Sequence, residues 1–325
     1  MREFPKPVVV VSKCLGFAAC RWNGLTIPDR FVESLKPFVE FRPVCPEMEI
    51  GLGVPRDPIR VVEEEGELRL IQPASGRDVT REMMAFAEDF MESAGEVDGF
   101  LLKSRSPSCG FRDVKVYPCR EKCAAISSKG HGYFGGTAAL IFEYKAIEDE
   151  ARLGDFHIRE NYLTKLFTIA DFRRVYESGS INELIDFHAR NKYLLMAISQ
   201  SHLKVLGQIV AGHMKGHAED VIQEYADEII EALTKPPKYK TIINAMMHAF
   251  GHFSKELKKE EKEYFLEMLE KYRNAKVPMS LPLGILRSHV IRFDDEYLKQ
   301  QTFFEPFPDA LVTVTDSGKG RERKG

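Results

Sequence analysis

The chain has 325 residues, of which 44% are hydrophobic and 29% are charged, and its formal net charge at pH 7 is -3. This length suits two domains, and the small negative charge excludes a protein that binds nucleic acid through bulk positive charge. No stretch approaches the roughly 20 apolar residues of a membrane-spanning helix, and no signal peptide is visible. We therefore expect a cytoplasmic protein with no membrane partner and no DNA partner.

Short β-branched runs alternate with amphipathic segments in the first part of the chain. The patterns predict strands at residues 8–12, 39–44, 68–72 and 99–103, and helices at residues 28–36, 79–93 and 137–150. This alternation is typical of a parallel sheet with covering helices. Residues 1–150 are therefore predicted to form a Rossmann-like α/β domain.

Long helical patterns replace the strand signals from about residue 151 onward. Apolar spacing predicts helices at residues 159–177, 181–211, 217–233, 239–253, 258–274 and 283–300. The tail at residues 317–325 is expected to be disordered, because it is short, polar and rich in glycine and charge. Residues 151–325 are therefore predicted to form a separate all-α domain.

All six cysteines lie in the first 123 residues, whereas eight of the nine histidines lie after residue 150. In a chain with no export signal, these cysteines favour metal binding or catalysis over a disulfide framework. Cys14 and Cys45 follow the first two predicted strands, and Cys109 follows the strand at residues 99–103. The carboxyl ends of parallel strands meet at one edge, where ligands bind. We therefore predict that these three thiols form a single site.

Three converging thiolates suit two kinds of metal centre. One is a tetrahedral zinc with a fourth, non-cysteine ligand, and the other is an iron-sulfur cluster held at only three of its irons. Three unrelated buried cysteines are the remaining alternative. Neighbouring residues favour a site, because Glu47 lies close to Cys45 as a candidate general base. Ser106 and Ser108 flank Cys109, where their hydroxyls could orient a substrate.

Basic residues accompany these motifs and would offset the negative charge of a thiolate-bound cluster. They are Lys13, Arg21, Arg56, Lys103 and Arg105.

Four ordered motifs surround the three cysteines. They are SKCLG at residues 12–16 with RWNG at 21–24, VCPE at 44–47, GL at 51–52 with PRDP at 55–58, and SPSCG at 106–110 after Lys103. In order and spacing these motifs resemble the thiouracil desulfidase (TudS-like) family over roughly residues 7–150. The helical half is similar to the companion domain of the longer, two-domain members, the tRNA 4-thiouridine desulfidases (RudS type).

The resemblance implies a [4Fe-4S] cluster held by Cys14, Cys45 and Cys109, whose fourth iron takes the sulfur of a thiocarbonyl base while water replaces that sulfur on carbon. It also implies that Glu47 and Ser106 are catalytic. We expect further motif residues to contact the substrate, namely Ser12, Arg21, Arg56, Lys103 and Ser108.

The remaining cysteines fall outside the ligand set that the resemblance implies, so Cys20 is expected to have no cluster role. Cys119 and Cys123 are four residues apart, and this spacing would allow them to oxidise together, to bind a second metal, or simply to be an incidental exposed pair.

The sequence therefore predicts a non-redox, iron-sulfur-dependent desulfidase that removes sulfur from thiouracil-type bases, with 4-thiouridine in tRNA as the favoured substrate. Two alternatives stay open. One is an enzyme that acts on free thiouracil or a thionucleoside, and the other is a non-catalytic, metal-stabilised binding module.

The helical half contains candidate RNA contacts. Residues 235–240 (KPPKYK) mix cations with an aromatic residue, as single-stranded RNA recognition would require, although a solvated loop has the same composition. One long predicted helix carries Asn191, Tyr193 and His202, which could also contact RNA.

Two histidine pairs with a spacing of four residues are predicted to share one side of a helix. They are His213 with His217 and His248 with His252. Helix packing or an RNA contact is the favoured interpretation, and a second metal site is a minor one.

Overall fold

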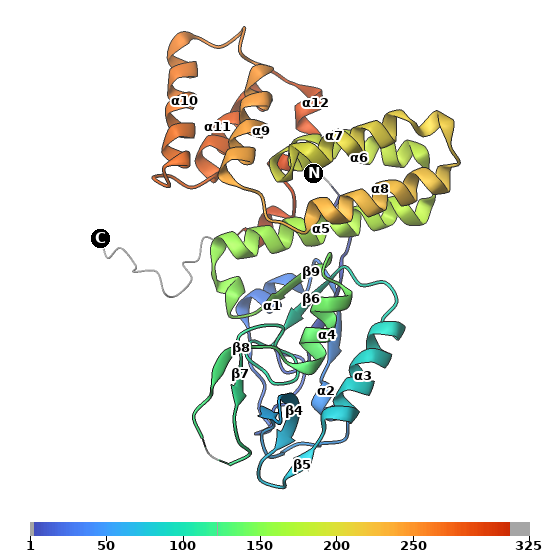
Figure 1. Cartoon of the computed structure of the whole chain (residues 1–325). Helices are drawn as coiled ribbons and strands as arrows, with labels where there is room; N and C mark the ends of the chain where they lie inside the picture. The colour runs from blue at the N-terminus through green and yellow to red at the C-terminus, as the bar shows by residue number, and fades with distance from the viewer. Residues whose placement is uncertain (1–2, 122, 313–325) are drawn as a thin grey trace. The chain divides into compact units, whose positions relative to one another are not determined.

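The computed structural model describes residues 3–121 and 123–312, which fall into two compact units (Figure 1). Unit 1 contains the described residues up to 170 and from 307 onward, and unit 2 contains residues 171–306. The division falls inside helix α5 (Phe156–Ser178). No helix in the described part of the chain has both the length and the apolar character of a membrane span. The prediction of disorder at residues 317–325 lies outside the described residues.

A four-stranded parallel sheet forms the centre of unit 1. Across the sheet the strands are β2 (Glu40–Val44), β1 (Val8–Ser12), β6 (Gly99–Leu102) and β9 (Ala146–Asp149). β1 lies in the middle, where Val10 is in register with Arg42 on one side and Phe100 on the other. The predicted α/β sheet with parallel strands is confirmed.

Both faces of this sheet are buried, and this explains the uninterrupted apolar sequence of β1. Successive side chains of a strand point to opposite faces. Val9 and Val11 pack in one core with α1 (Arg30–Leu35) and the first half of α5. Val10 packs in the other core with α3 (Thr80–Ser93) and α4 (Tyr133–Ile141), which lie side by side. Parallel sheets commonly have such cover on both faces.

Unit 1 also contains a five-stranded mixed sheet, of which only the strand at residues 68–72 was predicted. Its strands, in order, are β5 (Arg77–Asp78), β4 (Glu67–Gln72), β3 (Arg60–Glu64), β7 (Val114–Tyr117) and β8 (Ser127–Gly130). β3 and β7 are parallel, and the other pairs are antiparallel. Val61 and Val116 are in register and belong to the core that contains Val10. These strands are short and rich in charge, so they give little alternating signal.

The predicted helix at residues 137–150 is wrong in its second half. α4 ends at Ile141, and residues 146–149 form β9 instead. Ala146 is in register with Gly99, and a Cβ added to Gly99 would lie only 2.6 Å from the Ala146 carbonyl oxygen. Gly99 lets β9 come close to the edge of β6, where its backbone can form strand hydrogen bonds. This pairing with a distant segment overrides the local helical pattern.

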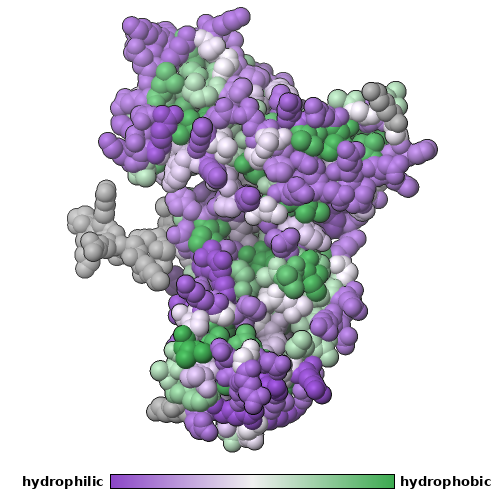
Figure 2. All heavy atoms as spheres, viewed as in Figure 1, coloured by the Kyte–Doolittle hydropathy of each residue, from purple (hydrophilic) through white to green (hydrophobic). Residues whose placement is uncertain are grey.

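Unit 2 is helical, as predicted. After α5 its helices are α6 (Ile181–Ile198), α7 (Gln200–Ala211), α8 (Ala218–Leu233), α9 (Tyr239–Gly251), α10 (Lys259–Arg273), α11 (Ser280–Arg292) and α12 (Glu296–Lys299). Phe250 and Phe265 stack in its core with ring centroids 4.3 Å apart. On the face drawn in Figure 2, mostly hydrophilic side chains cover these helices, with smaller hydrophobic groups between them.

Two predicted helices of unit 2 are wrong because each is broken by a polar cap. Residues 181–211 divide at Ser199, which is extended (φ −159°, ψ 117°) and whose hydroxyl accepts a hydrogen bond from the backbone N–H of His202. Residues 283–300 divide before Asp295, whose carboxylate accepts from the N–H of Leu298 at 2.8 Å. Side chains of this kind satisfy the free N–H groups of a new helix start.

The break at Ser199 separates residues that were expected to present an RNA surface on one helix. Asn191 and Tyr193 lie on α6, whereas His202 lies on α7. Asn191 and Tyr193 are only 1% and 4% exposed, so they belong to the interior of unit 2. Their predicted contact with RNA is wrong, because both side chains are buried and not accessible to a partner.

We expect Glu160 of α5 to make the stability of the protein depend on pH. Burial raises the pKa of this carboxyl from 4.5 to about 7, so the folded chain binds a proton more tightly than the unfolded chain. The stabilisation of the folded state that comes from this tighter proton binding is fully present below pH 4.5. It is lost as the pH rises through about 7. Glu160→Gln should therefore raise Tm by a few degrees at pH 8 and by much less at pH 5.

Thermal unfolding of the two proteins at both pH values checks this expectation. Glu88→Gln, at an exposed position of α3, is the matched control and should shift Tm little at either pH. An equal effect of Glu160→Gln at pH 5 and pH 8 would contradict the assignment.

Candidate functional site

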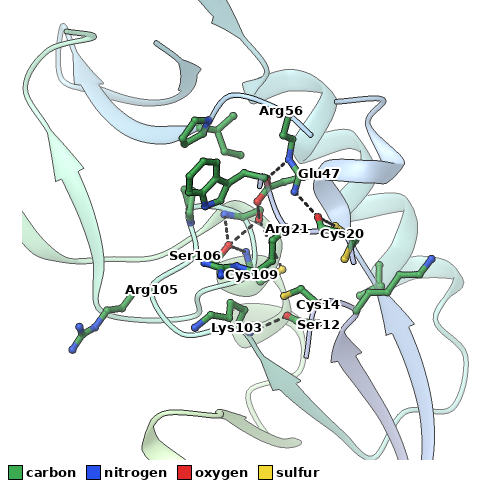
Figure 3. A pocket seen from close by; sticks show the side chains of 18 of the residues that line it. Ser12, Cys14, Cys20, Arg21, Glu47, Arg56, Lys103, Arg105, Ser106 and Cys109 are labelled. Atoms are coloured by element: carbon green, nitrogen blue, oxygen red, sulfur yellow. Dashed lines mark hydrogen bonds and ion pairs between the residues drawn. The ribbon is translucent and has the colours of Figure 1, made fainter. Parts of the chain in front are cut away.

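Cys14, Cys45 and Cys109 line one cavity of unit 1, at the carboxyl edge of the parallel sheet (Figure 3). The cavity has a volume of about 350 Å³. Cys14 comes two residues after β1, and Cys45 lies between β2 and the short helix α2 (Pro46–Glu49). Cys109 lies in the loop that follows β6. The parallel topology therefore brings together three thiols that are distant in the sequence.

Hydrogen bonds join the segments that carry these thiols. The buried hydroxyl of Ser12 accepts the backbone N–H of Lys103 at 2.8 Å, which ties the end of β1 to the end of β6. The N–H of Lys13 donates to the carbonyl of Val44 at 2.8 Å, which ties β1 to β2. The N–H of Ile27 donates to the Cys14 carbonyl at 2.7 Å. These hydrogen bonds therefore hold the segments around the cavity together.

Two glycines at the start of α4 pack directly against the Cys109 loop. A Cβ added at Gly135 would lie 2.1 Å from the Cys109 carbonyl oxygen, and one added at Gly132 would lie 2.6 Å from that of Ser108. The N–H of Gly132 donates to the Gly110 carbonyl at 2.6 Å. Sequence analysis missed this support, although the three glycines of HGYFGG at residues 131–136 are the feature that could have indicated a close backbone contact. Only glycine allows the two backbones to come this close.

Glu47 is held by two donors at the wall of the cavity. Its Oε1 accepts the hydroxyl of Ser108 at 2.7 Å, and its Oε2 accepts Arg56 Nε at 2.7 Å. The Glu47 and Arg56 side chains are only 14% and 4% exposed. A carboxylate fixed by a hydroxyl and a guanidinium in such surroundings keeps one orientation.

Arg56 is fully occupied by this part of the protein. Besides Glu47, its guanidinium donates to the Gly53 carbonyl at 2.7 Å and to the Cys20 carbonyl at 2.9 Å. The structure therefore gives Arg56 a supporting place behind Glu47, in addition to its place in the cavity wall.

Ser106 continues the hydrogen-bonded chain that begins at Glu47. Its Oγ lies 3.0 Å from the Ser108 hydroxyl and accepts the N–H groups of Cys109 and Ser108 at 3.1 and 3.3 Å. Because Ser108 donates its hydroxyl proton to Glu47, the hydroxyl proton of Ser106 is available to Ser108 or to a group in the cavity. Ser106, Ser108 and Glu47 therefore form a path along which a proton can move.

The basic residues of the cavity divide into paired and unpaired groups. Lys103 forms an ion pair with Glu150, whereas the side chains of Lys13, Arg21 and Arg105 show no acidic partner within residues 3–121 and 123–312. Figure 3 shows Arg105 directed away from the labelled thiols. The unpaired Lys13 and Arg21 leave the cavity wall with positive charge for an anionic cluster or substrate.

Burial and mutual contact set the pKa values of the thiols. Burial raises the pKa of Cys14 to about 11, with Cys45 adding to the effect, and burial also raises the pKa of Cys109. A hydrogen bond from Cys20 lowers the pKa of Cys45, and the same bond raises the pKa of Cys20. Two of the three candidate ligands are therefore protonated at neutral pH until a metal cation replaces their protons.

Cys20 is a fourth thiol of the same cavity, which sequence analysis missed. It is 5% exposed, and its carbonyl oxygen lies 3.8 Å from Cys45 Sγ. It is not directly attached to a strand end, so the rule that located the other thiols could not find it. Cys119 and Cys123 form a disulfide, which is one of the outcomes that their spacing allowed, and neither lines the cavity.

Of the two predicted histidine pairs, the structure contradicts the arrangement of the first only. His213 lies in a short 3-10 helix, and His217 precedes α8 as its N-cap, so the two do not share a helix face. His252 caps the C-terminus of α9, and its ring nitrogens contact the Tyr193 hydroxyl and the Asp295 carboxylate, each at 2.9 Å. Packing within unit 2 accounts for His252.

Family comparison divides the chain into two matched regions. Residues 9–150 match the family described as 2-thiouracil desulfurase. Residues 192–308 match a family described as a protein of unknown function, DUF1722. The first match contains every residue of the cavity described above.

Two individual relatives are also similar to the chain in sequence. The chain is 34% identical to the uncharacterized protein YbbK of Bacillus subtilis (strain 168) over 110 residues, which cover 32% of this chain and 73% of YbbK. It is 26% identical to the uncharacterized protein YbgA of Escherichia coli (strain K12) over 161 residues, which cover 49% of this chain and 95% of YbgA.

One solved structure is also similar in sequence, the [4Fe-4S]-dependent thiouracil desulfidase TudS. It is 30% identical, and the match covers 46% of this chain and 93% of that one. The TM-score is 0.35, so the relation rests on the sequence and not on superposed folds.

We expect Gly135→Ala to disturb the thiol cavity through the backbone. The new methyl group would meet the Cys109 carbonyl at 2.1 Å, so the loop must move, at a cost of about 2 kcal/mol or more. Tm should fall, and alkylation of Cys109, which is 6% exposed, should become faster. Mass spectrometry of the alkylated peptides measures this rate.

Gly284→Ala in α11 is the control, because nothing lies within 4 Å of a Cβ at that position. It should leave the alkylation rate unchanged and raise stability by roughly 0.5–1 kcal/mol. Normal Tm and slow Cys109 alkylation in the Gly135 variant would show that the loop tolerates the methyl group.

Proposed function

The chain belongs, through residues 9–150, to the 2-thiouracil desulfurase family, and from this premise we propose that it is a [4Fe-4S]-dependent desulfidase whose favoured substrate is 4-thiouridine in tRNA. The observation that carries the proposal is a single cavity that combines four free thiols, among them those of Cys14, Cys45 and Cys109, with an oriented carboxylate. In the reaction, water exchanges with the sulfur of a C=S group. The products are a C=O group and hydrogen sulfide, with no change of oxidation state.

The donor set of the cavity fits the cluster. Cys14, Cys45 and Cys109 supply three soft ligands, which suit iron-sulfur clusters, and unpaired cations of the wall offset the negative charge of the thiolates. When bound at three irons, such a cluster supplies an open iron that acts as a Lewis acid toward sulfur. Cys20 lies beside Cys45 as a hydrogen-bonding neighbour and is not required as a ligand.

Glu47 serves as the general base in this proposal. The Arg56 and Ser108 donors fix its carboxylate (2.7 Å each) at the wall of the cavity. It takes a proton from the attacking water and returns it to the departing sulfur. Ser106 donates a hydrogen bond from its hydroxyl to an oxygen or nitrogen atom of the base, and the Ser108 hydroxyl lies 3.0 Å from its Oγ. Ser12 and Lys103 order the backbone around the thiols.

The tRNA part of the proposal rests on the distribution of positive charge. Arg105 at the cavity is exposed and has no acidic partner among the described residues. In unit 2, Lys235, Lys238 and Lys240 are likewise exposed beside Tyr239, which is 46% exposed. Cations next to an exposed aromatic ring are the groups that bind phosphate and stack on unpaired bases. Residues 151–325 are thus proposed to position RNA.

Metal content and single-turnover chemistry test the catalytic proposal. Protein purified without oxygen should contain about four irons and four sulfides per chain. Cys14→Ala, Cys45→Ala and Cys109→Ala should each abolish this content, while Cys20→Ala should retain it. Glu47→Gln should keep the cluster and lose activity roughly 100-fold or more, because general base catalysis is removed.

The same measurements separate the alternatives. Zinc in place of iron after reconstitution, or no sulfide release from any thiouracil compound, would favour a metal-stabilised binding module. Full activity of Glu47→Gln with a normal cluster would remove Glu47 from the mechanism.

Charge variants test whether RNA is the substrate. Replacement of Lys235, Lys238 and Lys240 by alanine should raise KM for thiolated tRNA by roughly 10-fold at low salt and leave KM for 4-thiouridine nucleoside unchanged. The wild-type KM for tRNA should also rise with salt concentration. The matched control replaces three other exposed lysines of the same unit, namely Lys255, Lys259 and Lys276.

An equal effect of both triple variants would show that only total charge matters. Activity on free thiouracil or the nucleoside, with none on tRNA, would identify a small-molecule desulfidase instead.

A further inference from the structure

Trp22 has an unusual place for a tryptophan. It is the single tryptophan of the chain, it lines the thiol cavity, and it is 45% exposed. Among the described residues that line the cavity, it is the only one with an aromatic ring. The other lining side chains are thiols, hydroxyls, charged groups and small aliphatic groups. A planar, apolar ligand would therefore find one flat partner in this cavity.

The backbone of Trp22 is fixed although its side chain is exposed. The turn at residues 21–25 closes through Gly24 N–H to the Arg21 carbonyl at 2.9 Å and Arg21 N–H to the Leu25 carbonyl at 3.3 Å. Gly24 has φ +73°, a conformation that glycine adopts readily. The N–H of Arg56 donates to the Trp22 carbonyl at 2.8 Å. A fixed backbone lowers the entropy lost when a ligand orders the ring.

Arg56 couples this turn to the proposed general base. Its backbone N–H holds Trp22, and its side-chain Nε holds Glu47 Oε2 at 2.7 Å. The same guanidinium also fastens the Cys20 carbonyl, two residues before Trp22, at 2.9 Å. One residue therefore sets the indole backbone and the carboxylate relative to each other.

We propose that the indole of Trp22 is the stacking wall on which the pyrimidine ring of the thiolated base lies, which makes Trp22 the residue that selects planar bases. This inference rests on the proposed desulfidase function and names how its substrate is held. Every base presents a flat π-face, so stacking positions the ring without reading its substituents. The hydrogen-bonding groups at Glu47 and Ser106 then act at the edge of a ring whose plane is already set.

Kinetics of three variants on 4-thiouridine nucleoside provide the first test. Trp22→Leu removes the aromatic face and should raise KM by roughly ten-fold or more, with a smaller effect on kcat. Trp22→Phe keeps a flat ring and should stay within a few-fold of wild type. Leu25→Ala is the control, because it removes exposed apolar surface (Leu25 is 56% exposed) from the same turn. It should leave KM unchanged.

Fluorescence of the single tryptophan provides a second test that does not depend on turnover. Uridine added to the cluster-loaded wild-type protein should quench or shift the emission of Trp22 with saturation. Dihydrouridine, whose ring is not planar, should do so only weakly. The binding signal is measured in the wild-type protein. It therefore tests whether a base stacks on Trp22 even if Trp22→Leu loses its cluster.

The outcomes separate this inference from the proposed function. If wild type releases sulfide but Trp22→Leu keeps the wild-type KM, or if saturating uridine leaves the fluorescence unchanged, the stacking wall is overturned. The same holds if Leu25→Ala raises KM as much as Trp22→Leu, because general apolar contact would then explain the result. If wild type releases no sulfide from any thiolated base, the proposed function fails. The change in Trp22 fluorescence on addition of uridine still shows whether a planar base binds at this residue.

Discussion

The parallel pairing of β1 with β2 on one side and β6 on the other is the constraint on which the site depends. Parallel strands end at the same edge, so the residues that follow them converge whatever their separation in the sequence. The hydroxyl of Ser12 then locks this edge by accepting the Lys103 N–H. β1 can be central only because both its faces are apolar and covered. The burial of four consecutive valines thus places Cys14 beside Cys45 and Cys109.

The partly buried ion pair of Arg56 and Glu47 organises the cavity wall. Removing two charges from water is costly unless their hydrogen-bonding groups are satisfied, and the guanidinium meets this condition with the carbonyls of Gly53 and Cys20. The Cys20 carbonyl lies two residues before Trp22, and the backbone N–H of Arg56 donates to the Trp22 carbonyl itself. The energetic requirement of one buried cation therefore connects the proposed base, the fourth thiol and the exposed indole.

Charge in the protein is arranged locally and not in bulk. The net charge is -3, yet Lys13, Arg21 and Arg105 line the cavity without an acidic partner in the described residues. Overall charge governs long-range association, whereas individual unpaired cations govern which anionic group a cavity accepts. The weak global charge is therefore compatible with a substrate that carries phosphate.

The sequence by itself determined the parallel α/β core, the helical second half and the convergence of Cys14, Cys45 and Cys109, because apolar periodicity and strand-end position are local patterns. Only the tertiary structure decided that residues 146–149 add a strand beside β6, that Cys20 enters the cavity, and that Gly135 supports the Cys109 loop. These features depend on contacts between segments far apart in the chain. The free energy of a backbone hydrogen bond, a buried charge or a close glycine contact is decided by both partners, and one segment's sequence describes only one of them.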